Sequence, residues 1–359
     1  MGGSWHLGGS ERDDSAALTR APHAATQDAM HIDVCNGDAD GLCAVVQWRL
    51  HYPRAARFIT GLKRDIELLA LVDGSRGDQL LVCDLSMQRN MSPLMRLLEA
   101  GVHVRYFDHH KVDKIPDHPL LEAHVDVASE VCTSVLVDLH LGGRFRAWAA
   151  VGAFGDNLET VGDRLAASLG LSADDCLRLK SLGESINYNA YGDRVEDVWI
   201  PPQHLYELLV RYPDPLAFLE CEPVARELRA RRDCDMQQAL ALPAYMQRSH
   251  ASVYVFPDAA WSRRVSGSLA NWLAQAHPQQ AHAVITPTVA GDLLISVRSP
   301  RSSPTGAAEF CRRYGGDGRA AAAGIDHFPA AQLDALAADF LATPWADAPE
   351  TPCGRKGPE

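Results

Sequence analysis

The sequence predicts an α/β protein of two domains, a mostly parallel and doubly wound sheet followed by a smaller α/β domain across a helical linker. First, 359 residues are more than one compact core usually contains. Second, strand-like apolar segments alternate with helix-like segments from residue 31 to about residue 156, the pattern of an open parallel sheet with helices on both faces. Third, the pattern changes after residue 251 to short strands and a helix, which indicates a second domain.

The first domain is predicted from strand and helix units that follow one another. Residues 31–35 alternate like a strand, residues 36–41 form a turn rich in Gly and Asp, and residues 42–50 have the apolar character of a buried helix. The pattern continues with strands at 79–83, 102–107, 124–126 and 148–154 and with helices at 94–100 and 134–139. The carboxyl ends of such strands are where an open α/β sheet binds its ligands.

The rest of the chain is predicted to be helical and then mixed. Residues 166–219 have a helical pattern, and residues 222–246 are charged and helix-prone, as a connector would be. The later elements are strands at 252–256, 281–285 and 293–297 and helices at 266–273 and 307–314. We therefore expect a flexible tail over 1–29, a first domain over 30–220, a linker over 221–246, a second domain over 247–342 and a flexible tail over 343–359.

Charge and cysteine usage limit the class of protein. With 34 Lys and Arg against 46 Asp and Glu, the net charge is −12, which argues against a binder of long duplexes, so a nucleic-acid substrate should be short. The nine cysteines are scattered singly, without a C-x-x-C pair, as in proteins of a reducing compartment. No apolar run approaches the roughly 20 residues of a membrane span, and no secretory signal precedes the first strand. A cytoplasmic protein without a membrane partner is predicted.

Acidic residues and histidine follow several of the predicted strands. Asp38 and Asp40 lie two residues apart on a turn flanked by Gly, while Asp84, His109 and Asp156 each follow a predicted strand end. Four carboxylates and an imidazole are enough ligands for two divalent ions ~3.5–4 Å apart, which can activate water for attack on phosphorus. Any one of these residues alone is better explained as a turn former or helix cap. Together they favour a metal site.

These segments resemble a known family. The four N-terminal motifs of the DHH phosphoesterase superfamily are matched by NGDADG at 36–41, CD at 83–84, DHH at 108–110 and GDN at 155–157. Two later segments resemble the substrate-binding domain of the family's DHHA1 branch. They are SVRS at 296–299 and residues 315–325, which begin GGDGR. The resemblance covers about residues 31 to 340, with the motifs in the family's order.

The resemblance implies a manganese-dependent phosphoesterase with two Mn²⁺ ions per site, Mg²⁺ or Co²⁺ being substitutes, in a cleft between the DHH and DHHA1 domains. Carried over by position, the metal ligands would be Asp38, Asp40, Asp84, His109 and Asp156, with Asp84 bridging the ions. Asp108 would orient the ring of His109. His110 would face the scissile phosphate as a charge stabiliser or as the acid for the leaving group.

The sequence departs from the family pattern in the first motif. The branch that cleaves oligonucleotides and cyclic dinucleotides carries a histidine ligand four residues before the first motif aspartate, and here that position is Val34. His31 is offset by three residues. The departure resembles the single-strand exonuclease branch, in which the first metal has fewer protein ligands, and Asn36 is a candidate to contact the metal or the substrate.

The second departure is in the Gly-rich loop, where Arg319 stands in place of the family's histidine and Asp317 in place of a glycine. Successive backbone N–H groups can cradle a phosphate, and a guanidinium binds phosphate oxygens bidentately. The alternative to a phosphate-binding loop is an ordinary surface loop whose arginines are solvated. The candidate substrate contacts in this part of the chain are Arg298, Gly315, Gly316, Gly318 and Arg319.

The first prediction is a phosphodiesterase that releases nucleoside monophosphates from linear dinucleotides or RNA of a few residues, as a nanoRNase does. Three alternatives stay open: a single-strand exonuclease on longer DNA, a phosphatase of nucleotide 3′-phosphates, and a catalytically weakened nucleotide-binding regulator. The predicted partner is a short nucleic acid or nucleotide, and a homodimer is left open.

Overall fold

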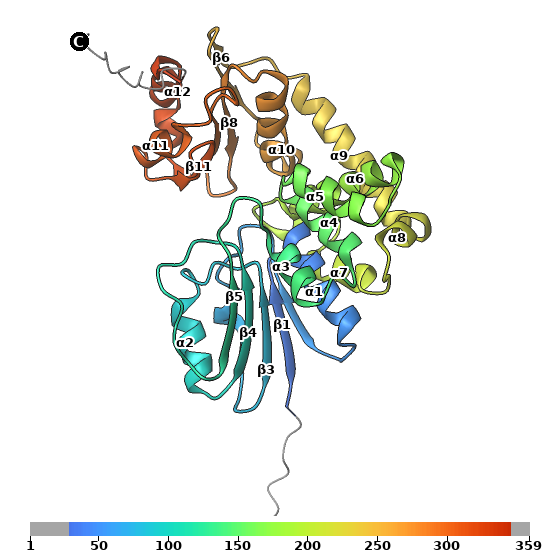
Figure 1. Ribbon diagram of the computed structural model, residues 1–359. Coiled ribbons are helices and arrows are strands. Elements are labelled where there is room, and N and C mark those ends of the chain that lie inside the picture. The colour runs from blue at the N-terminus through green and yellow to red at the C-terminus, as the bar shows by residue number, and fades with distance from the viewer. Residues whose placement is uncertain (1–28, 346–359) are drawn as a thin grey trace, which may run out of the picture.

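The computed structural model describes residues 29–345 and contains two β-sheets, each with its own hydrophobic core (Figure 1). Apart from residues 29 and 343–345, the tails predicted over 1–29 and 343–359 lie outside the described residues. No helix within 29–345 has both the length and the apolar character needed to cross a bilayer.

The first sheet is parallel throughout and has the strand order β2-β1-β3-β4-β5. Its strands are β1 (His31–Cys35), β2 (Arg57–Thr60), β3 (Gln79–Cys83), β4 (His103–Asp108) and β5 (Leu121–Val125). Strand β3, in the middle of the sheet, has only apolar residues between its ends because both of its faces are covered. Since the strands are parallel, all their carboxyl ends meet at one edge, which faces the second domain in Figure 1.

Helices cover both faces of this sheet, as a doubly wound fold requires. On one face, Val34, Val82 and Tyr106 belong to a core that includes Leu94 and Leu97 of α2. The other face is covered by the helices that follow β1 and β5 and share one core with it. The helical elements of the first domain are α1 (Ala39–His51), η1 (Leu68–Leu71), α2 (Met91–Glu99), α3 (Thr133–His140), α4 (Arg146–Gly155), α5 (Glu159–Ser168), α6 (Ala173–Ala190), η2 (Val195–Asp197), α7 (Pro202–Leu209) and α8 (Pro215–Cys221).

The second sheet is mixed and has the order β10-β11-β9-β8-β7-β6, with β7 and β8 as its parallel pair. Helix α9 (Pro223–Leu240) leads to it and lies within the segment predicted as the linker. The remaining elements are β6 (Met246–Gln247), β7 (Ala251–Val255), α10 (Ala260–Ala276), β8 (Ala281–Pro287), β9 (Leu293–Arg298), α11 (Ala307–Arg312), β10 (Asp317–Gly318), β11 (Ala322–Phe328), η3 (Ala330–Gln332) and α12 (Leu333–Ala342). The predicted two-domain α/β fold with a helical connection is confirmed.

One predicted strand is a helix. Residues 148–154 lie inside α4, so Asp156 is the C-terminal cap of a helix and does not follow a strand. Helix α4 packs against α1, α5 and α6 and is therefore buried on several sides. An apolar run without polar positions does not distinguish a buried strand from a buried helix. The prediction also missed β2, which is short and only half-buried at the sheet edge.

Buried ion pairs fix α10 of the second domain to the first domain and to the linker helix α9. Arg263 Nε lies 3.0 Å from Asp197 Oδ2, and Arg264 Nη2 lies 2.7 Å from Asp235 Oδ2. Tyr188, fully buried, donates its hydroxyl hydrogen to Asp235 at 2.5 Å. Tyr188 therefore packs between α6, α9 and α10. These contacts hold the second domain over the carboxyl edge of the parallel sheet.

Candidate metal centre

Three carboxylates surround one imidazole nitrogen at the carboxyl edge of the first sheet. His109 Nε2 lies 3.4 Å from Asp84 Oδ1 and 3.9 Å from both Asp40 Oδ2 and Asp156 Oδ2. The side chains of His109, Asp84 and Asp40 are at most 5% exposed, and that of Asp156 is 21% exposed. Four residues that are far apart in the sequence are thus brought to one small volume, as their places in the sequence motifs predicted.

Different local structures deliver these side chains. Asp84 follows β3 in the left-handed region at φ 58°, a conformation that Asp adopts more readily than most residues. Asp40 lies in the first turn of α1, and both its oxygens accept hydrogen bonds of 2.7 Å from the backbone N–H groups of Thr133 and Ser134 at the start of α3. Asp156 caps α4. Asp40 is therefore held rigidly by the positive end of a helix.

The hydrogen bond of His109 leaves one ring nitrogen for a cation. His109 Nδ1 lies 3.1 Å from the carbonyl oxygen of Val131. A carbonyl only accepts, so Nδ1 carries a hydrogen, and a cation that replaced the proton on Nε2 would bind to a lone pair that faces the three carboxylates. Carboxylate oxygens with one imidazole suit Mn²⁺ and related divalent ions. The residues present therefore fit a divalent cation.

Electrostatics also favour a cation at this place. Burial raises the pKa of Asp84 well above its ordinary value, and the charges of Asp38 and Asp40 raise it further. Burial and Asp40 also raise the pKa of Asp156. Burial alone would lower the pKa of His109, but the hydrogen bond with Asp84 and the charge of Asp40 outweigh it and raise the value to about 10. Without a positive charge among them, these carboxylates would repel one another in a low-dielectric site.

Asp38, the fifth predicted ligand, does not belong to the group around His109. Its Oδ1 caps α1 by accepting a hydrogen bond of 3.1 Å from Gly41 N, and its Oδ2 forms an ion pair with the Lys63 ammonium. Burial alone would lower the pKa of Lys63, but the charge of Asp38 outweighs it and raises that pKa well above its ordinary value. Lys63 was missed in the sequence, where nothing in the short segment after β2 marks it.

Asn36 holds Asp38 and Lys63 in place through hydrogen bonds. Its amide Nδ2 donates to the carbonyl oxygen of Lys63 at 3.0 Å, and its Oδ1 accepts from Asp38 N at 3.1 Å. The side chain is buried, and both ends of its amide are engaged within the protein. The structure therefore gives Asn36 a positioning role, whereas a contact with metal or substrate was expected.

Asp108 orients a different histidine from the one expected. Its Oδ1 lies 2.6 Å from His110 Nδ1 and accepts from His110 N at 3.1 Å, while its Oδ2 accepts from Met87 N at 3.1 Å. The prediction that Asp108 orients His109 is wrong, because the carboxylate turns onto the backbone two residues ahead, as Asp does in turns. The side chain of His110 is 45% exposed at the rim of the centre. Burial lowers its pKa, but the hydrogen bond that its ring donates to Asp108 outweighs this and raises the pKa above its ordinary value.

The Gly-rich loop does not present the phosphate cradle that was expected. The N–H groups of Gly315 and Gly316 donate to the carbonyl oxygens of Arg312 and Cys311 at 3.2 and 2.9 Å. A Cβ on Gly316 would lie 2.2 Å from Gly324 O, and one on Gly318 would lie 2.5 Å from Ala323 Cα. These glycines allow close pairing with β11, and their backbone is used in the fold. Arg319 is exposed beside them, without an ion-pair partner in the described part of the chain.

Arg298 is connected to the metal centre through two amides. Its Nε donates to Asn271 Oδ1 at 2.8 Å, and Asn271 Nδ2 donates to Asn157 Oδ1 at 3.0 Å, one residue after Asp156. A cavity of about 620 Å³ lies between the domains here, and its lining includes Asn157, Asn271, Arg298 and Arg301. Of the predicted substrate contacts in the second domain, Arg298 lines this cavity and is joined through Asn271 to Asn157, the neighbour of Asp156 in the sequence.

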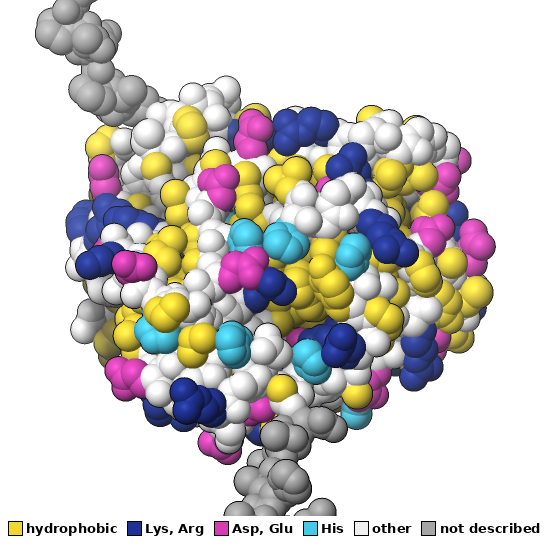
Figure 2. Space-filling view, turned by 60° about the horizontal axis from the view of Figure 1, so that its bottom comes forward, with side chains coloured by type: hydrophobic (Ala, Val, Ile, Leu, Met, Phe, Trp, Pro, Cys, Tyr) yellow, Lys and Arg dark blue, Asp and Glu magenta, His cyan; other side chains and the backbone are white. Residues whose placement is uncertain are grey.

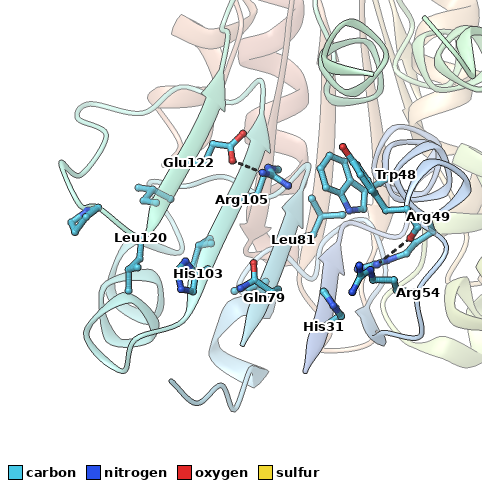
Figure 3. Close-up of a pocket in the computed structure, with 15 residues that line it drawn as sticks. His31, Trp48, Arg49, Arg54, Gln79, Leu81, His103, Arg105, Leu120 and Glu122 are labelled. Atoms are coloured by element: carbon cyan, nitrogen blue, oxygen red, sulfur yellow. Dashed lines mark hydrogen bonds and ion pairs between the residues drawn. The ribbon is translucent and has the colours of Figure 1, made fainter. Parts of the chain in front are cut away.

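A separate hollow of about 480 Å³ lies at the opposite, amino edge of the sheet (Figure 3). His31 and His103 mark the starts of their strands in this hollow, so His31 is remote from the metal centre. Figure 2, which shows the molecule from this side, displays several histidines and basic side chains around an apolar surface. Glu122, which also lines this hollow, lies 2.5 Å from Arg105 and 2.7 Å from His124, and His124 stacks on Phe107. Ion pairing and aromatic packing are sufficient to explain why these side chains lie together.

Comparison with known proteins supports the fold. No protein-family model matches the chain, and no curated protein matches its sequence. The pGpG-specific phosphodiesterase PggH from Vibrio cholerae superposes with a TM-score of 0.50 and 15% identity, over 87% of this chain and 99% of that chain. CDC45 from Entamoeba histolytica matches with a TM-score of 0.43 and 9% identity, over 88% of this chain and 96% of that one. The fold expected from the resemblance to DHH phosphoesterases with a DHHA1 domain is thus confirmed.

Proposed function

We propose that this protein is a divalent-metal-dependent phosphodiesterase that cleaves linear dinucleotides or very short oligonucleotides to nucleoside monophosphates, with Mn²⁺ as its metal. The observation that carries the proposal is the convergence of Asp40, Asp84 and Asp156 on His109 Nε2. The fold shared with a pGpG-specific phosphodiesterase and the net charge of −12 support a short substrate. The eight cysteines among residues 29–345 are free, which supports a reducing, cytoplasmic location.

In this proposal each residue of the centre has a separate task. A divalent cation held by Asp40, Asp84, Asp156 and His109 would lower the pKa of water and offset the charge of the phosphate. Asp40 keeps its position through the two N–H groups of α3, which fixes the ligand geometry. His110, oriented by Asp108 and exposed at the rim, donates a proton to the leaving oxygen.

Replacing His110 by Gln is expected to lower kcat for a dinucleotide by about 100-fold or more, because a positioned general acid contributes roughly 10²–10⁴. Mn²⁺ affinity should fall far less than kcat, because Nδ1 of His110 is bonded to Asp108, although a ring nitrogen of His110 lies within 4.8 Å of ligand atoms of Asp84 and His109. Steady-state kinetics and calorimetric Mn²⁺ titration measure the two effects. His118→Gln, in the loop before β5, is the matched control and should leave kcat unchanged. Equal losses of kcat and Mn²⁺ affinity in His110→Gln would make it a ligand instead.

Replacing Arg298 by Gln is expected to raise KM for a dinucleotide by about 10- to 100-fold with a smaller change in kcat, because a hydrogen bond to a charged group contributes about 1.5–3 kcal/mol. Arg298 lines the cavity between the domains and is held beside Asn157 through Asn271. Arg313→Gln, whose guanidinium pairs with Asp339 on the outer surface, serves as the control. An unchanged KM in Arg298→Gln would remove it from the substrate site.

A time course with 5′-labelled RNA and DNA from dimers to decamers, including pGpG, tests the proposed function with Mn²⁺ and with EDTA. Rapid cleavage of dimers and trimers that stops on chelation is expected. Processive shortening of long DNA would favour the exonuclease, and release of inorganic phosphate from a 3′-phosphonucleotide would favour the phosphatase. Tight binding without turnover would favour the regulator.

A further inference from the structure

We infer that the ammonium group of Lys63 takes the place of a second divalent cation, so that the centre binds one ion tightly and uses Lys63 as its second positive charge. The inference rests on the proposed metal-dependent function and concerns the composition of the same centre. It replaces the expectation of two ions per site.

The structure brings three carboxylates and one imidazole together at one ion position. Three carboxylate oxygens lie within 3.9 Å of His109 Nε2, and Asp38 supplies none of them. One oxygen of Asp38 is taken by the N-terminus of α1 and the other by Lys63. A second ion would have to share Asp38 with the N-terminus of α1 and with Lys63, and would otherwise depend on a share of Asp84, on His110 and on water.

Strand β1 offers no imidazole to a second ion beside Asp38, and the remaining imidazole of the centre, that of His110, lies beside Asp84 and His109 with its Nδ1 bonded to Asp108. Val34, which stands where a histidine ligand would be, is fully buried and belongs to the core formed with α2. His31 lies at the amino end of the same strand and lines the hollow on the opposite side of the sheet. The missing ligand is therefore not replaced by another histidine in the described structure around Asp38.

Lys63 is held in place as a fixed charge. Its backbone N–H donates to Ala190 O at 2.9 Å, and its carbonyl accepts from Asn36 Nδ2 at 3.0 Å. Its Nζ also lies 3.4 Å from Asn187 Oδ1 and 5.7 Å from the centre of the Tyr191 ring. Because Asn36 also bonds to Asp38 N, one amide fixes both partners of the ion pair.

The position of this charge suits a phosphate. The side chain of Lys63 is 26% exposed, whereas that of Asp38 is 4% exposed, so the ammonium is the accessible member of the pair. An ammonium donates up to three hydrogen bonds, and after bonding to Asp38 it can still donate to a phosphate oxygen. A preorganised positive charge of this kind stabilises the charge that develops on phosphorus-bound oxygens. The centre thereby keeps two positive groups while loading only one metal.

Mn²⁺ titration of the metal-stripped protein tests the inference without any substrate. Wild type should bind one Mn²⁺ per chain, and its electron paramagnetic resonance spectrum should lack the signal of an exchange-coupled pair. Lys63→Gln should gain a second ion, with its affinity raised about tenfold or more, because the competing charge on Asp38 is removed. Arg64→Gln, the neighbouring position whose guanidinium pairs with Asp193 at 3.1 Å, should behave as wild type.

Two tightly bound ions and a coupled spectrum in wild type would overturn the inference, and this result needs no folded variant. One ion in both wild type and Lys63→Gln would also overturn it, since removal of the ammonium would then have freed no site. A wild type that binds one ion but hydrolyses no nucleotide would overturn the proposed function and leave the role of Lys63 standing.

Discussion

Replacing Asp84 by Asn is expected to lower kcat for a dinucleotide by about 1,000-fold or more and to abolish tight Mn²⁺ binding. Asp84 makes the shortest approach to His109 Nε2, at 3.4 Å, and is the carboxylate between the Asp38 and Asp40 sides of the centre. A loss of that size corresponds to several kcal/mol of transition-state stabilisation, which is what metal-ion catalysis supplies. Kinetics at saturating substrate, with calorimetric Mn²⁺ titration of the same protein, provide the measurement.

The same substitution should not damage the fold. Asp84 is in the left-handed region at φ 58°, which Asn tolerates as well as Asp does. Because its folded-state pKa is raised, ionised Asp84 opposes folding at neutral pH in the metal-free protein. Metal-stripped Asp84→Asn should therefore unfold at a higher temperature than metal-stripped wild type, with the difference vanishing as pH falls below the ordinary pKa of Asp. Lost activity together with a lower Tm would point to misfolding. Asp117→Asn, on an exposed loop, is the control.

The site residues that could be predicted from the sequence are those whose place in the fold follows from the direction of the strand or helix that carries them. Asp84 and His109 follow parallel strands, and such strands bring their carboxyl ends to one edge whatever the details of packing. Asp40, in the first turn of α1, and Asp156, at the end of α4, lie beside them. The four residues were therefore grouped together from the sequence, although the segment before Asp156 was predicted as a strand and is the helix α4.

The contacts that were missed depend on side-chain direction and on pairs of distant segments. Lys63 meets Asp38 across 25 positions, and no periodicity marks such a contact. Asp108 has two histidines next to it, and only the backbone geometry after β4 decides that His110 is its partner. The glycines at 316 and 318 were read as a ligand cradle, yet the same absence of a Cβ permits close strand pairing, and the sequence pattern is identical in both cases.

Helix α1 links the site to the stability of the sheet. Asp38 caps its N-terminus, Asp40 lies in its first turn, and Arg49 of its last turn bonds to Asp33 in the middle of β1. The pair is bidentate, with Nε and Nη2 each 2.5 Å from a carboxylate oxygen, and Asp33 is completely buried. The ion pair therefore sets how α1, and with it two candidate site residues, lies on the strand.

Replacing Arg49 by Met is expected to lower the free energy of unfolding by about 3–5 kcal/mol, because it leaves a buried carboxylate without its counter-charge. Urea unfolding followed by circular dichroism, with an unchanged m value, measures the loss. Adding Asp33→Leu should restore most of it, since an apolar pair of similar volume is often as stable as a buried ion pair.

The pH dependence of the single variant tests the cause. Burial already raises the pKa of Asp33 against the opposing effect of Arg49, and without Arg49 this carboxyl should be protonated over a wider range. A group whose folded-state pKa is raised contributes stability below its unfolded pKa and loses it as pH rises, so the deficit of Arg49→Met should grow from pH 4 to pH 7. A deficit below about 1 kcal/mol at pH 7 would mean that water from the hollow beside Arg49 solvates Asp33, and α1 would then be held by its apolar contacts alone.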